Sequence, residues 1–223
     1  FLNFKSKVNR IDLYALNLSA TPLSFNADLD INLSGTGIND FVGDIDIRNL
    51  AMNVKDSTYK LENVYILSRL LAKGGKELKV ESDLGMVSIN GQYDLPNIAR
   101  SVKKILYANY PQITKSWKND VEKFSGNQKF DFNIDLLKSD NFLSLAGLNA
   151  SQFRRFILKG KIDTYKNELS LASDIPFLKI KSDSLNDIQL LVTSDSKAGD
   201  VLLHVDSTFA FGRHFNPIDI QTN

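Results

Sequence analysis

Apolar and polar residues alternate strictly along several segments of the chain. The clearest segment, residues 25–34, has its apolar positions at Phe25, Ala27, Leu29, Ile31 and Leu33. The residues between them are Asn, Asp or Ser. Because successive side chains of a strand point to opposite faces, this segment predicts a strand with one apolar and one polar face. The same pattern recurs at residues 130–136 and 201–206.

Similar alternation predicts strands through most of the chain. The expected ranges are 24–34, 41–54, 58–67, 76–82, 86–93, 128–137, 156–164, 168–173, 176–181, 187–194 and 200–211. The apolar register shifts within residues 8–18 and again near Asn49, and each shift indicates a β-bulge or bend. Residues 67–72 predict a short helical turn that ends at Gly74 and Gly75.

The pattern changes at residues 94–96, where Asp-Leu-Pro predicts the start of a helix. Apolar residues then follow at helical spacing: Ile98, Val102, Ile105 and Leu106. We therefore expect an amphipathic helix over residues 96–109. A weaker helical or extended segment is expected at residues 113–124.

The order of these elements sets the fold class. We expect a mostly β protein, a curled antiparallel meander sheet of the β-groove type with one inserted amphipathic helix. Its parts are a first block at residues 1–95, a helical linker at 96–126 and a second block at 127–223, all in one continuous elongated sheet. Residues 139–147 and 151–156 predict short helices or loops. The chain opens inside a strand-like pattern without an initiator Met, so we expect an internal piece of a longer protein.

Composition and charge narrow the classes of function. The 27 basic and 26 acidic residues nearly cancel, which argues against a nucleic-acid partner. The chain contains no Cys, and this excludes disulfides and thiolate metal sites. No apolar run reaches the ~18 residues that a membrane-spanning helix needs. What remains is a folded β protein whose apolar faces must be covered.

The kind of group that covers the apolar faces decides the function. One solution is a closed β-sandwich, a scaffold or binding module without lipid, and ordinary antiparallel sheets alternate in the same way. The other solution is a lipid, because each buried methylene of an acyl chain contributes roughly 0.8 kcal/mol. A wall for acyl chains needs no charged pocket, and the apolar registers consist mainly of Leu, Ile, Phe and Val.

Residues able to carry catalysis or to bind a metal form no convincing set. Three acid pairs share a strand face and could bind calcium: Asp28/Asp30, Asp44/Asp46 and Asp131/Asp135. Each pair lies opposite the apolar face, where solvated carboxylates are expected. The two histidines, His204 and His214, have no third ligand to complete a zinc site. We expect a protein that is not an enzyme, with no catalytic residue, no metal and no cofactor.

Three basic residues lie on the polar side of the expected helix: Arg100, Lys103 and Lys104. They could contact anionic headgroups. More often such residues form the solvated face of a helix whose apolar side packs on a sheet.

Residues 80–95 read Val-Glu-Ser-Asp-Leu-Gly-Met-Val-Ser-Ile-Asn-Gly-Gln-Tyr-Asp-Leu. This order, with Ser-Asp ending a strand and Gly-x-Tyr-Asp-Leu following the next one, resembles a repeat of the TamB (translocation and assembly module) family within the AsmA-like superfamily. The helix that ends in Tyr-Ala-Asn-Tyr-Pro at residues 107–111 resembles the family's linker helix, although Asn109 stands where the family often has an aromatic pair. Segments between residues 158 and 190 resemble the next block, so the likeness covers about residues 25–205.

This resemblance implies a segment of a long periplasmic protein of a Gram-negative bacterium, spanning between the inner and outer membranes. Such a segment would shield phospholipid acyl chains in an apolar β-groove during phospholipid transport to the outer membrane and outer-membrane protein assembly. The implied partners are an outer-membrane barrel protein of the TamA type and an inner-membrane anchor in another part of the chain.

The expected groove lining consists of apolar residues from the alternating strands. They are Phe25, Leu29, Ile31, Leu33, Ile45, Ile47, Phe130, Phe132, Ile134, Leu136, Leu203 and Val205. Their expected role is to provide a continuous apolar wall with its polar face outward.

Overall fold

The structure is a computed structural model, and it describes most of the chain. The described residues are 1–17, 19–54, 57–72, 74–109, 111, 114–122, 124, 126–137, 152–195 and 199–222. The segment predicted at 139–147 and residue 151 of the segment predicted at 151–156 lie outside the described residues.

Fourteen strands form one antiparallel sheet, and two short helices with two 3₁₀ turns interrupt the described chain between the sixth and seventh strands. The strands are β1 (Leu2–Asp12), β2 (Leu23–Ser34), β3 (Val42–Val54), β4 (Ser57–Leu70), β5 (Lys76–Ser82), β6 (Gly85–Gln92), β7 (Lys129–Leu136), β8 (Gln152–Phe153), β9 (Phe156–Asp163), β10 (Glu168–Ile180), β11 (Asp183–Ser194), β12 (Gly199–Ala210), β13 (Arg213–Phe215) and β14 (Ile218–Thr222). The helical elements are η1 (Leu95–Asn97), α1 (Ile98–Asn109), η2 (Lys115–Trp117) and α2 (Lys118–Glu122).

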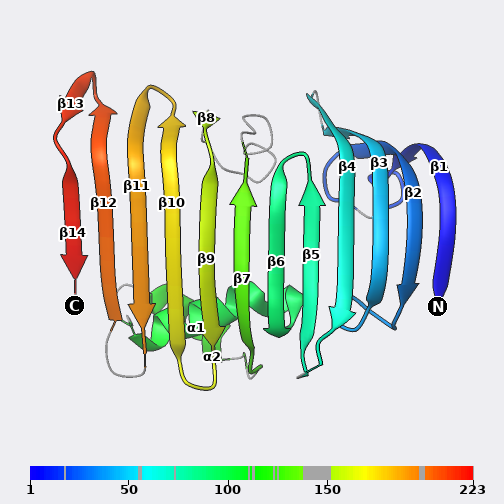
Figure 1. The fold of residues 1–223 in the computed structure, drawn as a ribbon, viewed down its shortest axis with the longest axis horizontal. Helices are drawn as coiled ribbons and strands as arrows, with labels where there is room; N and C mark the ends of the chain where they lie inside the picture. The colour runs from blue at the N-terminus through cyan, green and yellow to red at the C-terminus, as the bar shows by residue number, and fades with distance from the viewer. Residues whose placement is uncertain are drawn as a thin grey trace.

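Neighbouring strands follow the chain order from β1 to β7 and from β9 to β12. At the end of the sheet β13 and β14 both pair with β12, and β8 pairs with β10. Figure 1 shows the strands side by side, with β1 and β14 at opposite edges and the helices behind one end of the strands. The predicted fold class, a curled antiparallel meander with an inserted helix, is confirmed. The described strands all belong to this one sheet, so they do not form a two-sheet sandwich.

The helical segment is an excursion from a continuous sheet. Strand β6, which precedes it, pairs directly with β7, which follows it, from Gly85↔Leu136 to Gln92↔Lys129. The helix begins where Pro96 occupies the first 3₁₀ turn, a position where the missing N–H of proline is not needed.

Both predicted β-bulges are present. The pairing of β1 with β2 shifts between Val8 and Ile11, and the pairing of β2 with β3 shifts between Asn26 and Asp28. Arg10 and Asn49 lie at these shifts with positive φ angles of 62° and 54°. In each case the extra residue returns the apolar side chains to the same face of the sheet.

Two local predictions are wrong. Residues 67–70 are strand rather than helical turn, because Ser68 pairs with both Gly43 and Leu78 and so continues β4 to Leu70. The segments predicted at 168–173 and 176–181 are one strand, β10, which passes through Pro176 and ends at Ile180. Proline is tolerated there because the described pairing of β10 with β9 ends at Asp174 and the pairing with β8 begins at Leu178.

Candidate functional site

One face of the sheet carries an unbroken cross-strand row of side chains. The register of each strand pair links, in order, Phe4, Ile31, Ile45, Ile66, Val80, Val87, Ile134, Leu158, Ser173, Leu190, Leu203 and Ile220. Each of these residues lies directly opposite the next one, so one line of apolar contacts crosses twelve strands. We call this line the central row.

The central row contains one polar residue, Ser173. It lies between Leu158 of β9 and Leu190 of β11. Its hydroxyl oxygen is buried and has no hydrogen-bond partner among the described residues. The row therefore carries no charged group from one edge of the sheet to the other.

Parallel rows on the same face complete the apolar surface. On one side, Leu33, Gly43, Ser68, Leu78, Ile89, Phe132, Gly160, Leu171, Val192 and Val201 follow each other across the strands. On the other side, Leu29 lies opposite Ile47 and Ile47 opposite Val64, while Ile188 lies opposite Val205 and Val205 opposite Ile218. Small residues such as Gly43 and Gly160 leave room beside larger ones, and the ring of Phe132 lies over Gly160.

The structure places all twelve predicted lining residues on this face. Four of them lie in the central row: Ile31, Ile45, Ile134 and Leu203. Ten of the twelve are partly exposed, whereas Phe130 and Val205 are buried, at 3% and 5% exposure. The sequence reasoning missed several members of the row, including Ile66, Val80, Val87 and Leu190. In β5 and β6 the signal was the same alternation over a shorter segment. In β4 and β11 the next residue, Leu67 or Leu191, is apolar as well and obscures the alternation.

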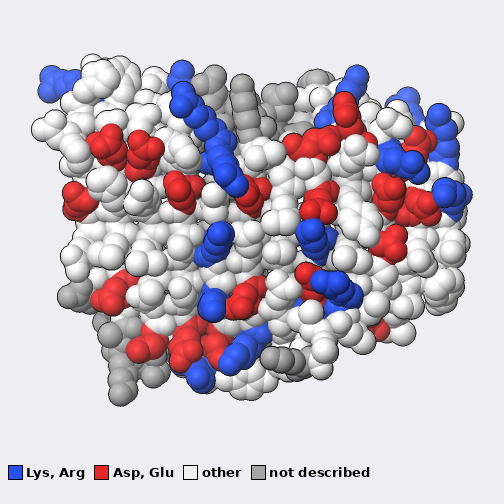
Figure 2. Space-filling view, viewed as in Figure 1, with Lys and Arg blue, Asp and Glu red and all other residues white. Residues whose placement is uncertain are grey.

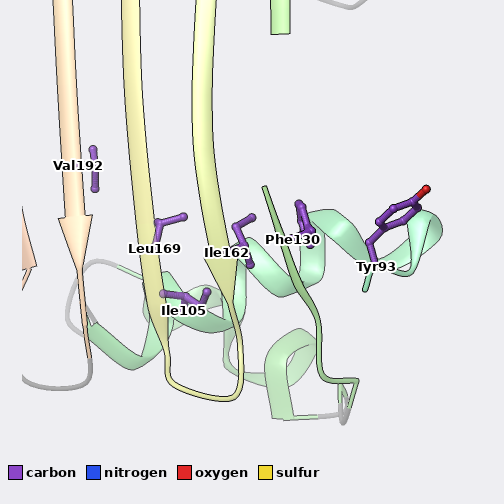
Figure 3. Close-up of a cluster of buried hydrophobic side chains, with 6 residues drawn as sticks. All are labelled: Tyr93, Ile105, Phe130, Ile162, Leu169 and Val192. Carbon is purple, nitrogen blue, oxygen red and sulfur yellow. The ribbon is translucent and has the colours of Figure 1, made fainter. Parts of the chain in front are cut away.

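Helix α1 covers one margin of the apolar face. Ile105 of the helix is fully buried, and it forms a cluster with residues at the ends of the strands: Tyr93, Phe130, Ile162, Leu169 and Val192. Figure 3 shows these side chains gathered between the strands and the helix. The rings of Tyr93 and Phe130 meet edge to face with their centroids 6.3 Å apart. Phe130 is therefore part of a closed core under the helix, and Ile31 and Ile45 remain outside that cluster.

Polar residues fix the start of the helical segment to the sheet. Asp94 accepts hydrogen bonds from the Nδ2 atoms of Asn39, at 2.8 Å, and Asn97, at 2.6 Å. Its backbone N–H donates to Oε1 of Gln128 at 3.0 Å. Gln128 is 1% exposed, and its own backbone N–H donates to the Thr164 hydroxyl at 2.7 Å. The start of the helical segment is thus held by hydrogen bonds to Asn39 of the β2–β3 connection and to Gln128, the residue before β7.

The basic side chains of α1 are largely engaged within the helical segment. Asp120 of α2 forms ion pairs with Lys103, at 2.7 Å, and with Arg100, at 3.5 Å. The ammonium group of Lys104 lies 6.0 Å from the ring centroid of Phe124. These contacts favour the interpretation of the three residues as a solvated face that joins α1 to α2.

The other face of the sheet is polar. Figure 2 shows this side, from which the helices are hidden behind the strands, with Lys, Arg, Asp and Glu spread over the whole width. Acidic residues there form ion pairs with basic residues of neighbouring segments, for example Asp30 with Lys5 of β1 at 2.6 Å and Asp135 with Arg155, just before β9, at 2.6 Å. The hydrogen bond from Arg155 holds the pKa of Asp135 below its usual value.

The predicted acid pairs and histidines do not converge on a metal site. In the described part of the chain no group of three or more His, Asp or Glu side chains is arranged to hold a metal ion. Nδ1 of His204 lies 2.7 Å from Asp219 of β14, and the ring of His214 lies 4.9 Å from that of Phe209. Both contacts join the last strands of the sheet.

The Ser-Asp pair of residues 82 and 83 has a structural role. The Asp83 carboxylate accepts hydrogen bonds from the backbone N–H groups of Glu62 and Asn63. The Ser82 hydroxyl accepts one from the backbone of Leu84 at 3.2 Å. The bonds from Asp83 satisfy backbone N–H groups of β4 beyond the point where its partner strand β5 ends. The bond to Ser82 shapes the turn from β5 into β6.

Comparison of the chain with protein-family models, with curated proteins and with solved structures gives no match. Among the described helices, none is long and apolar enough to cross a membrane.

Proposed function

We propose that the apolar face of the sheet shields lipid acyl chains, and that the chain is a segment of a non-enzymatic lipid conduit. The observation that carries the proposal is the central row, in which eleven of twelve side chains are apolar and which no described layer covers along its length. Such a face in water gains stability when apolar groups cover it.

The dimensions of the face suit acyl chains. Twelve strands at a spacing of about 4.8 Å make the row about 50 Å long. The acyl chains of one leaflet occupy about half of a hydrocarbon core of ~30 Å. The row can therefore contact more than one lipid in succession. Each methylene that it removes from water contributes roughly 0.8 kcal/mol, and the headgroup needs no specific pocket.

The position of α1 agrees with passage along the sheet. The helix lies across the ends of strands near Phe130, Ile162 and Leu169, at one margin of the face. It narrows the apolar face from the side: Leu190 of the central row packs against its core cluster, whereas Ile134 and Leu158 lie outside the cluster. A helix in this position acts as a side wall of a groove rather than as a plug.

The cellular setting rests on the resemblance of residues 80–95 to the TamB family. On that basis we place the protein in the periplasm of a Gram-negative bacterium, between the inner and outer membranes. The lipid would be phospholipid bound for the outer membrane, and outer-membrane protein assembly would be a linked role. The partners would be a TamA-type barrel protein and an inner-membrane anchor.

Native mass spectrometry of the gently purified protein, with lipid extraction from the same sample, tests the proposal directly. We expect stoichiometric phospholipid. A lipid-free mass with no extractable lipid would contradict the proposal and favour a scaffold or binding module.

Charged substitutions in the central row test the role of the face. Ile31→Asp and Ile134→Asp should abolish lipid binding and transfer of a fluorescent phospholipid between vesicles, because a carboxylate interrupts the apolar wall. Asn32→Asp is the matched control, since it adds the same charge at the neighbouring exposed position on the polar face. Circular dichroism checks that each variant is folded. Unchanged lipid transfer in folded Ile31→Asp and Ile134→Asp would overturn the proposal.

A further inference from the structure

We propose that the polar face of β10, β11 and β12 is a docking surface for a basic, amphipathic segment of a partner protein. This surface lies on the side of the sheet opposite the central row. It is therefore independent of what covers the apolar face, and it goes beyond the proposed binding of lipid.

An exposed apolar row crosses these three strands on the polar face. Ala172 of β10 lies opposite Leu191 of β11, and Leu191 lies opposite Leu202 of β12. Each of the three is next in sequence to a member of the central row, so it faces the other side of the sheet. Leu191 and Leu202 are 41% and 40% exposed, and the helices lie behind the sheet in this view (Figure 1). The polar face thus exposes apolar side chains at positions where the alternation of the other strands places polar ones.

A hollow follows the apolar row across the strands. It is lined by this row and by the next row on the same face, which runs from Asp174 of β10 to Asp219 of β14. One side of the hollow is therefore apolar, and the other side carries two carboxylates. Beyond the apolar row, Asp200 lies two residues before Leu202 on the same face of β12. A ligand that covers the leucines has carboxylates on both sides.

The charge of the last strands differs from that of the first ones. Strands β1–β5 contain eight basic and eight acidic residues. Strands β10–β14 contain seven acidic residues and two basic ones, Lys179 and Arg213. The acidic residues all occupy polar-face positions: Glu168, Asp174, Asp183, Asp187, Asp200, Asp206 and Asp219. At the left of Figure 2, over β11, β12 and β14, red groups are spread between white ones, and blue is seen only near the upper corner.

Several of these carboxylates have no basic neighbour. Glu168 forms an ion pair with Lys166 at 3.8 Å, and Asp219 lies 2.7 Å from His204. By contrast, Asp200 is exposed and forms no ion pair with a described side chain, and the same holds for Asp187 and Asp206. A basic partner gains from complementary charge at this surface, whereas the charge-balanced face of β1–β5 offers no such gain.

The chemistry of the surface selects the kind of partner. A negative surface repels anionic lipid headgroups and nucleic acids. In the described part of the chain no group of acidic side chains and histidines is arranged to hold a metal ion. The exposed leucines require apolar contact in addition to charge. A protein segment with Lys or Arg on either side of apolar residues supplies both.

An NMR titration of the isotopically labelled chain tests the inference. The probe is a synthetic amphipathic peptide of Lys and Leu, long enough to span about 20 Å as a helix, which is the distance along β12 from Asp200 to Asp206. We expect chemical-shift changes centred on Ala172, Leu191 and Leu202, and an affinity that falls as the salt concentration rises. A peptide with Glu in place of Lys and a peptide with Ser in place of Leu should each bind at least about tenfold more weakly.

Substitutions on the surface separate its two components. Leu202→Thr should weaken binding of the Lys–Leu peptide by about fivefold, because it removes apolar contact and keeps a residue that favours strands. Asp200→Asn should weaken it by about threefold at low salt. Tyr65→Thr and Asp46→Asn are the matched controls on the charge-balanced polar face of β4 and β3, and they should leave the affinity unchanged. Circular dichroism checks that each variant is folded.

Three results would overturn the docking surface. One is the absence of binding up to several hundred micromolar peptide. Another is equal binding of the peptide that contains Ser, or equal weakening by the control variants, since either shows a general charge effect. The third is a set of chemical-shift changes confined to the central row, which means that the leucines of the peptide enter the apolar face. That last result leaves the proposed lipid conduit standing, so the two proposals fail separately.

Discussion

The apolar face of this sheet has two regions that differ in how they are covered. Under α1, Ile162, Leu169 and Phe130 are at most 3% exposed. Farther along the same strands and toward β2, side chains such as Ile31, Ile45 and Ile134 stay partly exposed. Both regions have the same residue types and the same alternation. The helix accounts for the cover in the first region. Outside it, Ile188 and Val205 are also buried, but every side chain of the central row stays at least partly exposed.

Truncation of one isoleucine in each region should give the largest difference. Ile162→Ala removes a fully buried side chain under α1 and should lower the free energy of unfolding by about 2–5 kcal/mol. Ile45→Ala removes a partly exposed side chain in the central row and should cost about 1 kcal/mol in the lipid-free protein. Urea unfolding followed by circular dichroism measures both. Equal costs would mean that the central row is as well covered as the margin.

Two aspartates allow a second comparison of the two regions. Asp94 anchors the helical segment that covers one region, and Asp83 binds the backbone of β4 in the other. Asp94→Ala removes the hydrogen bonds to Asn39 and Asn97 and should destabilise the start of the helical segment, at a cost of about 1–3 kcal/mol. Hydrogen exchange should show faster exchange in α1 than in β2 and β3. Asp83→Ala is the matched change in the open region, and its faster exchange should be confined to β4 around Glu62 and Asn63. Loss of protection in α1 after Asp83→Ala would contradict this division.

The strands and the bulges could be predicted from the sequence because their signals are local. The alternation in residues 25–34 predicts both the strand and which of its faces is apolar. The register shift near Asn49 indicates the bulge that the pairing shows. The polar start of the helix at Asp94 and Pro96 is equally local.

The remaining features depend on contacts between distant segments. Residues 67–70 favour a helical turn by themselves, but pairing of Ser68 with Gly43 and Leu78 holds them in β4. The edge strand β14 has five residues and is defined by its pairing with β12. The side chains that α1 covers depend on the direction in which the helix leaves β6. No local pattern of apolar residues encodes that direction.

Ser173→Val should make every side chain of the central row apolar. The Ser173 hydroxyl is buried without a partner among the described residues, and the residues on either side of it in the row are apolar. A valine replaces the unsatisfied hydroxyl with a methyl group and adds a second methyl group to the row, so the free energy of unfolding should rise by about 1 kcal/mol. Phospholipid binding should be retained or tightened. A loss of stability would indicate that the hydroxyl has a partner or that the site has no room for a second methyl group.

The smallest expected effect concerns acid stability. It compares two carboxylates of the polar face, Asp163 near the end of the strands that α1 covers and Asp135 near the opposite end of β7. Burial by itself raises the pKa of Asp163, but the hydrogen bond and charge of Lys129 and the backbone N–H groups of Lys166 and Tyr165 outweigh it, so the pKa is lowered. A carboxyl group whose pKa is lower in the folded state stabilises the fold above its unfolded pKa of about 3.9, and the contribution is lost as the pH falls through the folded value.

Asp163→Asn should therefore lower the stability of the protein at pH 7 and make the loss of stability below about pH 4 less steep. Asp135→Asn, which breaks the exposed pair with Arg155, should change the same profile less, because solvent screens that pair. Thermal unfolding of both variants between pH 2 and 7 measures the difference. A larger change for Asp135→Asn would show that the pair with Arg155, rather than the Lys129–Asp163 pair near α1, controls acid stability.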